Sequence, residues 1–126
     1  MAEDWPQFRG GNASGVSSST GLPAEFSSQK NVAWRVKLGD GIGSPAVMRG
    51  RVFSTAMVGE RSAAVFALDA ASGRPLWRTE FATGVLPRIT PPNSHASSTP
   101  AADGDRVYVH FSTIGLLAFD AATGAE

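Results

Sequence analysis

Two aspartates occupy equivalent places in a sequence motif that occurs twice, and paired carboxylates are common agents of acid–base chemistry. The first copy covers residues 67–77 and contains Asp69, and the second covers residues 118–126 and contains Asp120. General acid–base catalysis requires both groups to reach one substrate. Because repeated motifs belong to separate structural units, the two carboxylates should lie apart. We therefore interpret both aspartates as turn residues, each shaping the chain before a glycine.

The other candidates for chemistry are the two histidines, His95 and His110. Strand alternation places His110 on one face with Arg106 and Tyr108, opposite three apolar neighbours. Two imidazoles alone do not complete a zinc site, which takes at least three protein ligands. The chain also has no glycine-rich phosphate loop and no nucleophile elbow. The sequence therefore predicts no catalytic residue and no metal site.

One segment has the character of a binding loop. Residues 82–98 form a long polar connection that includes consecutive prolines, which stiffen and shape the backbone. Loops on rigid scaffolds often carry function. We therefore take Arg88, Asn93 and His95 as candidates for contact with a ligand or a partner.

Composition excludes several classes of partner. The 126 residues include 11 basic and 11 acidic side chains, and the formal net charge is zero. The basic residues are scattered, so a nucleic-acid partner is not expected. No apolar stretch is long enough for a membrane helix, and the first residues do not resemble a signal peptide. The chain has no cysteine, which excludes disulfides and thiolate chemistry.

The elements that must position these residues are strands. Residues 1–30 lack a sustained period, and we expect an N-terminal arm pinned by aromatic and apolar anchors at Trp5, Phe8, Leu22 and Phe26. From residue 31 onward, apolar and polar residues alternate with the period of a half-buried strand. Turn signals then divide the chain into short segments. The expected strands are residues 31–38, 44–48, 51–57, 63–69, 76–81, 99–102, 106–111 and 115–120.

The strands themselves repeat. Residues 44–46 correspond to residues 99–101, and residues 51–53 correspond to residues 106–108, at a spacing of 55 residues. No segment has a helical period. Repeats of four short antiparallel strands with a recurring aromatic are typical of the blades of a β-propeller.

The repeated motif, A-x-D-x-x-[ST]-G-x-x-x-W, resembles the tryptophan-docking motif of propellers related to pyrroloquinoline-quinone (PQQ) dehydrogenases. That superfamily includes the propeller lipoprotein of the outer-membrane barrel-assembly machinery. Residues 5–10 and 93–100 resemble the N-terminal part of exported bacterial PQQ-binding-like propeller repeat proteins. The residues assigned to docking are Ala67, Asp69, Gly73, Trp77, Ala118, Asp120, Gly124 and Trp34.

The resemblance implies an all-β fold of antiparallel four-stranded blades from an eight-bladed propeller that is incomplete in this chain. Residues 1–30 would be the arm and residues 31–126 the partial propeller. Within it, residues 31–38 would be the last strand of one blade, residues 44–81 a full blade, and residues 99–120 three strands of the next. Each docking tryptophan would pack against a neighbouring blade. The second motif stops before its tryptophan, so we expect an N-terminal two-blade fragment.

Two functions follow from the resemblance, and a third follows from the count of eight expected strands, which is two blades' worth. The first is a non-catalytic binding or assembly scaffold in the bacterial cell envelope, with a periplasmic or secreted parent and either a protein or the missing blades as partner. The second is a fragment of a PQQ-dependent dehydrogenase; PQQ and calcium are expected only in that case, and no residue here matches their ligands. The third is a propeller fragment that assembles into a homo-oligomeric ring.

Overall fold

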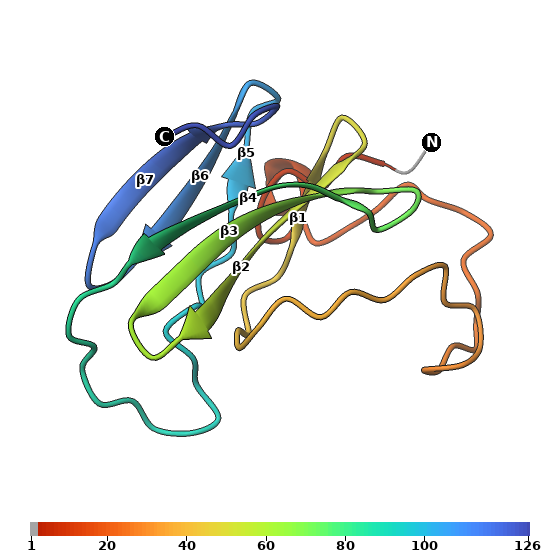
Figure 1. Cartoon of the computed structure of the whole chain (residues 1–126). Coiled ribbons are helices and arrows are strands. Elements are labelled where there is room, and N and C mark those ends of the chain that lie inside the picture. The colour runs from red at the N-terminus through yellow and green to blue at the C-terminus, as the bar shows by residue number, and fades with distance from the viewer. Residues whose placement is uncertain (1–2) are drawn as a thin grey trace.

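The computed structural model describes residues 3–126, and its regular structure is almost entirely β. One 3-10 turn, η1 (Gly11–Ala13), precedes two antiparallel sheets, ordered β1-β2-β3-β4 and β5-β6-β7 (Figure 1). The strands are β1 (Ala46–Met48), β2 (Arg51–Gly59), β3 (Ser62–Asp69), β4 (Pro75–Ala82), β5 (Ala101–Ala102), β6 (Arg106–Phe111) and β7 (Gly115–Asp120). Sheets of four and three strands confirm the predicted all-β fold of an incomplete propeller.

The first sheet is a meander, in which each strand pairs with the next one along the chain. β2 and β3 are its central strands, and Phe53 lies opposite Ala67 in their register. The two strands extend further than expected, so the predicted hairpin tip at residues 58–62 shortens to residues 60–61. A register shift between Met57 and Gly59 accommodates this tight end.

In the second sheet, buried and exposed side chains alternate along β6, as the sequence predicts. Along β6, Val107, Val109 and Phe111 are buried, whereas His110 is exposed. β7 follows after a short turn and pairs with β6 along its whole length. Successive side chains of a strand point to opposite faces, so one face of this sheet is apolar and covered.

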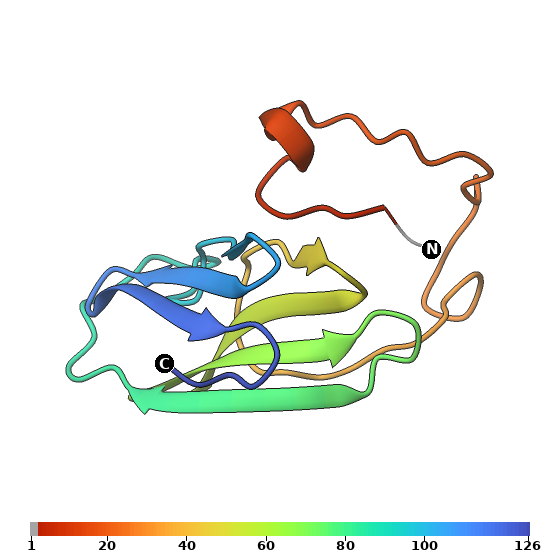
Figure 2. The ribbon, with the colours of Figure 1, turned by 90° about the horizontal axis from the view of Figure 1, so that it is seen from above.

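The main core lies between the two sheets. Figure 2 shows the second sheet laid against one face of the first. The phenyl ring of Phe81 on β4 contacts Phe111 edge-on and stacks against Phe119, with ring centroids 5.3 Å and 6.2 Å apart. One cluster of buried residues runs across both sheets and includes Phe53, Val65, Val107 and Phe119. The two blades therefore share a single hydrophobic core.

The predicted strand at residues 31–38 is not formed. Burial alternates as expected, since Trp34 and Leu38 are half-buried and Arg35 is exposed, but no β-ladder includes these residues. The backbone joins the sheet only at an isolated bridge between Asp40 and Met57. A strand requires a neighbouring strand for its hydrogen bonds, and residues 3–126 place none beside this segment.

The prediction of an anchored arm is also wrong in most of its detail. Phe8, Leu22 and Phe26 are 62%, 69% and 78% exposed, so none of them anchors the arm. Only Trp5 does so, because its backbone exchanges two hydrogen bonds with Val47 on β1. The glycines and serines of residues 10–21 offer little apolar surface against which these side chains could be buried.

The connections between strands lie in two groups, one at each end of the sheets. The β1–β2 turn, the β3–β4 turn and the segment after β7 lie at one end, beside the N-terminal arm (Figure 1). The β2–β3 tip, the β6–β7 turn and the long connection from β4 to β5 lie at the other end. Among residues 3–126 there is no helix with the length and hydropathy needed to cross a bilayer.

Candidate functional site

Asp69 closes the turn between β3 and β4. One oxygen of its carboxylate accepts hydrogen bonds from the backbone nitrogen and the hydroxyl of Ser72, at 2.9 Å and 2.7 Å. The Ser72 hydroxyl is the largest cause of the lowered pKa of Asp69, and the Ser72 backbone N–H is the next. The carboxylate is therefore engaged in holding the turn.

Asp120 repeats this geometry after β7. Its carboxylate accepts bonds from the backbone nitrogens of Ala122 and Thr123, at 3.0 Å and 2.8 Å, and from the Thr123 hydroxyl at 2.8 Å. Its pKa is lowered mainly by the Thr123 hydroxyl and then by the Thr123 backbone N–H. The two aspartates sit in the same type of turn on different sheets, as their repeated context predicted.

Two tryptophans dock on these turns in the same way. The indole nitrogen of Trp34 donates to the carbonyl of Ala70 at 3.0 Å, and that of Trp77 donates to the carbonyl of Ala121, also at 3.0 Å. Each indole also lies over the turn glycine, so closely that a Cβ added to Gly73 or Gly124 would come within 2.5 Å of the ring. The docking motif therefore joins one segment to the turn of the next sheet.

The alanines of the motif provide space for this contact. Ala67 is fully buried, and it lies opposite Trp77 in the register of β3 and β4. Ala118 takes the equivalent place on β7, opposite Tyr108, and is only half-buried. A larger side chain at residue 67 would compete with the indole for the same volume.

The long connection after β4 borders a polar cavity of about 340 Å³. Asn93 and His95 line the cavity, together with His110 from β6 and a group of hydroxyl side chains. Ser94 also lines the cavity; it is almost fully buried, and its hydroxyl donates to the Asp40 carboxylate at 2.8 Å. The cavity thus presents imidazoles, an amide and hydroxyls on a fixed backbone.

The predicted loop residues divide around this cavity. Asn93 and His95 are in its lining, whereas Arg88 is exposed on the same connection and does not line it. His110 and Ser94 also line the cavity, although neither is among the predicted loop candidates. Alternation along β6 had placed His110 on the exposed face, but only the fold brings it beside His95.

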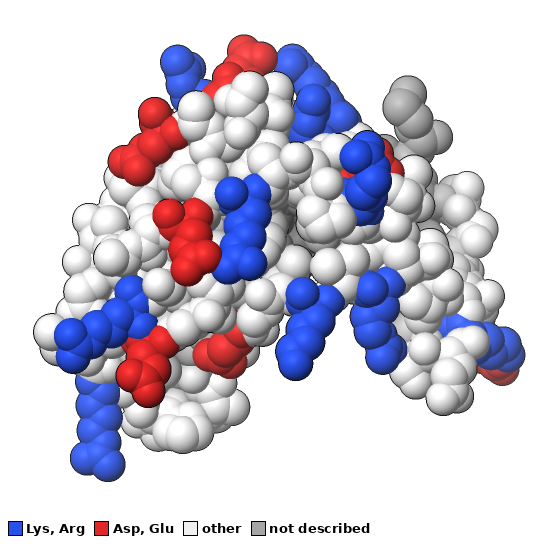
Figure 3. Space-filling view, in the orientation of Figure 1, with Lys and Arg blue, Asp and Glu red and all other residues white. Residues whose placement is uncertain are grey.

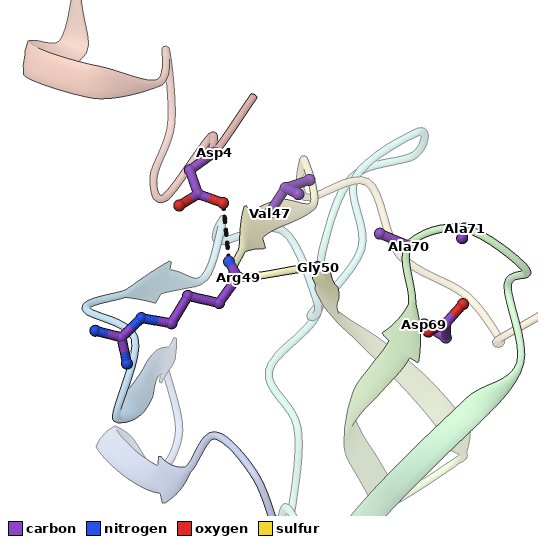
Figure 4. Close-up of a pocket in the computed structure, with 7 residues that line it drawn as sticks. All are labelled: Asp4, Val47, Arg49, Gly50, Asp69, Ala70 and Ala71. Carbon is purple, nitrogen blue, oxygen red and sulfur yellow. Dashed lines mark hydrogen bonds between the residues drawn. The ribbon is translucent and has the colours of Figure 1, made fainter. Parts of the chain in front are cut away.

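A second cavity, of about 690 Å³, lies at the opposite end between the arm and the first sheet (Figure 4). Its two carboxylates already have partners, because Asp4 accepts the backbone N–H of Arg49 at 2.8 Å and Asp69 holds its own turn. The Arg49 guanidinium points away from the cavity toward Asp105. The remaining walls are small, chiefly Gly50, Ala70 and Ala71. We therefore take the polar cavity as the candidate site.

The chemistry that the polar cavity can perform is recognition by hydrogen bonding. Its lining includes no carboxylate to orient either imidazole, so the usual hydroxyl–imidazole–carboxylate relay is not assembled there. Within residues 3–126, no group of three or more histidines, aspartates or glutamates converges as metal ligands do. Calcium takes six to eight oxygen ligands, several of them carboxylates, so these residues do not fit a calcium-held quinone.

The charges on the surface shown in Figure 3 do not favour a partner of one particular charge. On the face shown in Figure 3, basic and acidic side chains are interspersed rather than gathered into patches of one sign. The ion pairs on the surface, such as Arg78 with Glu80, are exposed at both partners. Exposed pairs of this kind contribute little to stability. No electrostatic footprint of a polyanion binder is visible on this face.

Two antiparallel sheets that share one core and repeat the same turn define the class of protein, an incomplete β-propeller. A family model described as outer membrane protein assembly factor BamB matches residues 24–126. The match covers most of the chain, so the chain belongs to this family of PQQ-like propeller repeats. No curated protein sequence matches it.

Proposed function

We propose that this chain is a non-catalytic propeller segment that serves as a binding scaffold in the bacterial cell envelope. Membership of a family described by outer-membrane protein assembly supports an envelope role, in the periplasm or outside the cell. The partner in this proposal is a protein, received at the polar cavity and the loop beside it. Protein recognition needs a rigid frame with polar groups at fixed positions, and the shared core supplies that frame.

The observation that carries the proposal is that the repeated residues stabilise turns and contacts between sheets. Asp69 and Asp120 accept hydrogen bonds within their own turns, and Trp34 and Trp77 lie on the turn glycines. In each aspartate a single carboxylate oxygen accepts all of these turn hydrogen bonds. In the loop cavity, the side chains of Asn93 and His95 make no hydrogen bond to the described residues.

Photocrosslinking from two positions tests the scaffold proposal. A photoreactive amino acid at residue 93 faces the cavity, and one at residue 74 lies on the exposed docking turn at the other end. Incubated with a bacterial envelope extract, the first should crosslink one discrete protein that the second does not. A His95→Ala, His110→Ala variant should lose that product. Identical products from both positions, or a product indifferent to the histidine substitutions, would contradict the proposal.

The second candidate function, a quinoprotein dehydrogenase, is favoured by the PQQ-like character of the repeats. In that enzyme the quinone would accept the electrons of the oxidised substrate. We propose that this chain binds no such cofactor, because its cavity lacks carboxylates. When the protein is titrated with PQQ in the presence of Ca²⁺ and then separated from free ligand on a column, no quinone absorbance should elute with the protein. Saturable binding at one quinone per chain would overturn the non-catalytic proposal.

A further inference from the structure

Two imidazoles from separate parts of the chain line the polar cavity. His95 lies on the connection between β4 and β5, and His110 lies on β6. Neither imidazole makes a hydrogen bond to residues 3–126, and the same holds for the side-chain hydroxyls of Ser97 and Ser112, which also line the cavity. The partners of these polar groups therefore come from outside the described residues, either from a ligand or, in its absence, from water.

The backbone that carries His95 is held in place by the segment before β1. The N–H groups of Ile42 and Gly43 both donate to the carbonyl of Ala96, at 3.0 Å and 3.3 Å. Gly43 also passes so close to the connection that a Cβ there would lie 2.6 Å from the carbonyl oxygen of Ser98. Ala96 is only 2% exposed. Because the neighbours of His95 are fixed in this way, less conformational freedom is lost when a ligand binds beside it.

The lining of the cavity has no permanent charge of either sign. In the part of the chain that the structure describes, the two histidines are its only titratable side chains. The carboxylate of Asp40 does not line the cavity and accepts the hydroxyl of Ser94 at 2.8 Å. The charged side chains on the surrounding elements do not line it either: Arg88 on the connection, Arg106 on β6, and Glu60 and Arg61 on the β2–β3 tip. An anion that enters the cavity thus meets hydrogen-bond donors and no opposing carboxylate.

We propose that the polar cavity binds a carboxylate of an acidic segment in the protein partner, with His95 and His110 as its charged donors. This inference rests on the proposed function, which places a protein partner at the same cavity. Imidazoles are the side chains that ordinarily gain their charge between pH 8 and pH 5. Two imidazolium groups that face one cavity repel each other, and a bound carboxylate relieves this repulsion while it accepts their hydrogen bonds. Binding therefore strengthens as the pH falls.

The lining favours a carboxylate over the other charged groups that a protein partner carries. A lysine or arginine side chain would find no acidic group in the lining formed by residues 3–126. A phosphorylated side chain carries more charge and is usually held by arginine or lysine. Neither residue type lines the cavity. An aspartate or glutamate side chain needs only the imidazoles and hydroxyls that are present there.

Nuclear magnetic resonance with short synthetic peptides tests the ligand class. The probe is a short peptide of aspartates with blocked ends, and peptides of asparagines and of lysines with the same length are its controls. His95 and His110 are the only histidines of the chain, so their ring signals can be followed directly. The aspartate peptide should shift both signals and bind roughly tenfold more tightly at pH 5.5 than at pH 8. Absence of these shifts, equal shifts with either control peptide, or pH-independent binding would overturn the proposal.

A matched pair of substitutions tests the place of binding. His110→Asp and Val85→Asp each put a carboxylate at an exposed residue of this region, but only residue 110 lines the cavity, and Val85 is 77% exposed elsewhere on the connection. His110→Asp should abolish binding of the aspartate peptide, whereas Val85→Asp should retain it. His110→Lys keeps its charge at both pH values, so it should bind at pH 8 and depend less on pH. Equal binding by the two aspartate variants, or an undiminished pH dependence in His110→Lys, would contradict the proposal.

Competition with the crosslinked product from residue 93 separates this inference from the scaffold role. If an acidic segment holds the partner, an excess of the aspartate peptide should suppress the product at pH 5.5, and the asparagine peptide should not. A discrete product that resists the aspartate peptide would keep the scaffold role and overturn the acidic recognition. A bound aspartate peptide without any discrete crosslinked product would support carboxylate recognition and overturn the scaffold role alone.

Discussion

Gly124 and Gly50 have the same backbone conformation, with φ of 74°, but different surroundings. A Cβ at Gly124 would come within 2.5 Å of the Trp77 ring, whereas a Cβ at Gly50 would meet none of the described residues within 4 Å. Gly50→Ala should therefore lose only the conformational term, about 1–2 kcal/mol. Gly124→Ala should lose a further 1–3 kcal/mol or so, because the indole must move. Urea unfolding of both variants measures the difference, and equal losses would show that the indole is not seated on Gly124.

The two turn aspartates should make the fold sensitive to acid. Their pKa values are lowered in the folded chain, so their stabilising contribution is present above the unfolded pKa, near 3.8, and is lost as pH falls through the folded pKa. Asp69→Asn with Asp120→Asn should lower stability at pH 6 and flatten the loss of stability below about pH 4. Unfolding measured from pH 2 to pH 6 tests this. Glu60→Gln, on the β2–β3 tip, is the control and should keep the steep acid limb.

At the residue scale, the roles of residues that act on near neighbours in the sequence were predictable. The meeting of residues that are far apart in the sequence was not. The turn role of Asp69 follows from its distance to Ser72 and Gly73, which lie within four residues of it. The cavity joins His95 to His110, whose proximity depends on how a long connection returns to the second sheet. The spacing of residues in the sequence does not predict the path of that connection.

At the scale of the strand, β6 allows a test with two adjacent residues. Val109 is 2% exposed in the shared core, whereas His110 is exposed on the opposite face. Val109→Asp would bury an unpaired carboxylate and should destabilise the fold by more than about 4 kcal/mol. His110→Asp should stay within about 0.5 kcal/mol of the parent. Thermal unfolding compares them, and a similar loss for both would contradict the assigned faces of β6.

The strands were predictable where their partners are close in sequence. All seven strands lie within two residues of their expected bounds, because turn signals in the sequence separate each strand from its neighbours along the chain. Residues 31–38 have a cleaner alternation than β1, yet they form no ladder among the described residues. Alternation reports which face is buried, and pairing depends on a neighbour that this pattern does not specify.

At the scale of the whole molecule, the shared core predicts one cooperative transition. The cluster that includes Phe53 on the first sheet and Phe119 on the second is continuous across both blades. Neither small sheet has another covered face of comparable size, and small sheets alone are marginal in water. Tryptophan fluorescence and circular dichroism should therefore give coincident unfolding curves in urea. Separate midpoints would contradict a common core.

The central claim is that the repeated motif joins blades by seating a tryptophan on the turn of the next sheet. A double-mutant cycle between Trp77 and Gly124 tests it most directly, with Trp77→Val chosen to keep strand propensity while removing the indole. Gly124→Ala should be more damaging in the parent, and in the Trp77→Val background its effect should shrink to that of Gly50→Ala. The same loss from Gly124→Ala with and without the indole would contradict the claim.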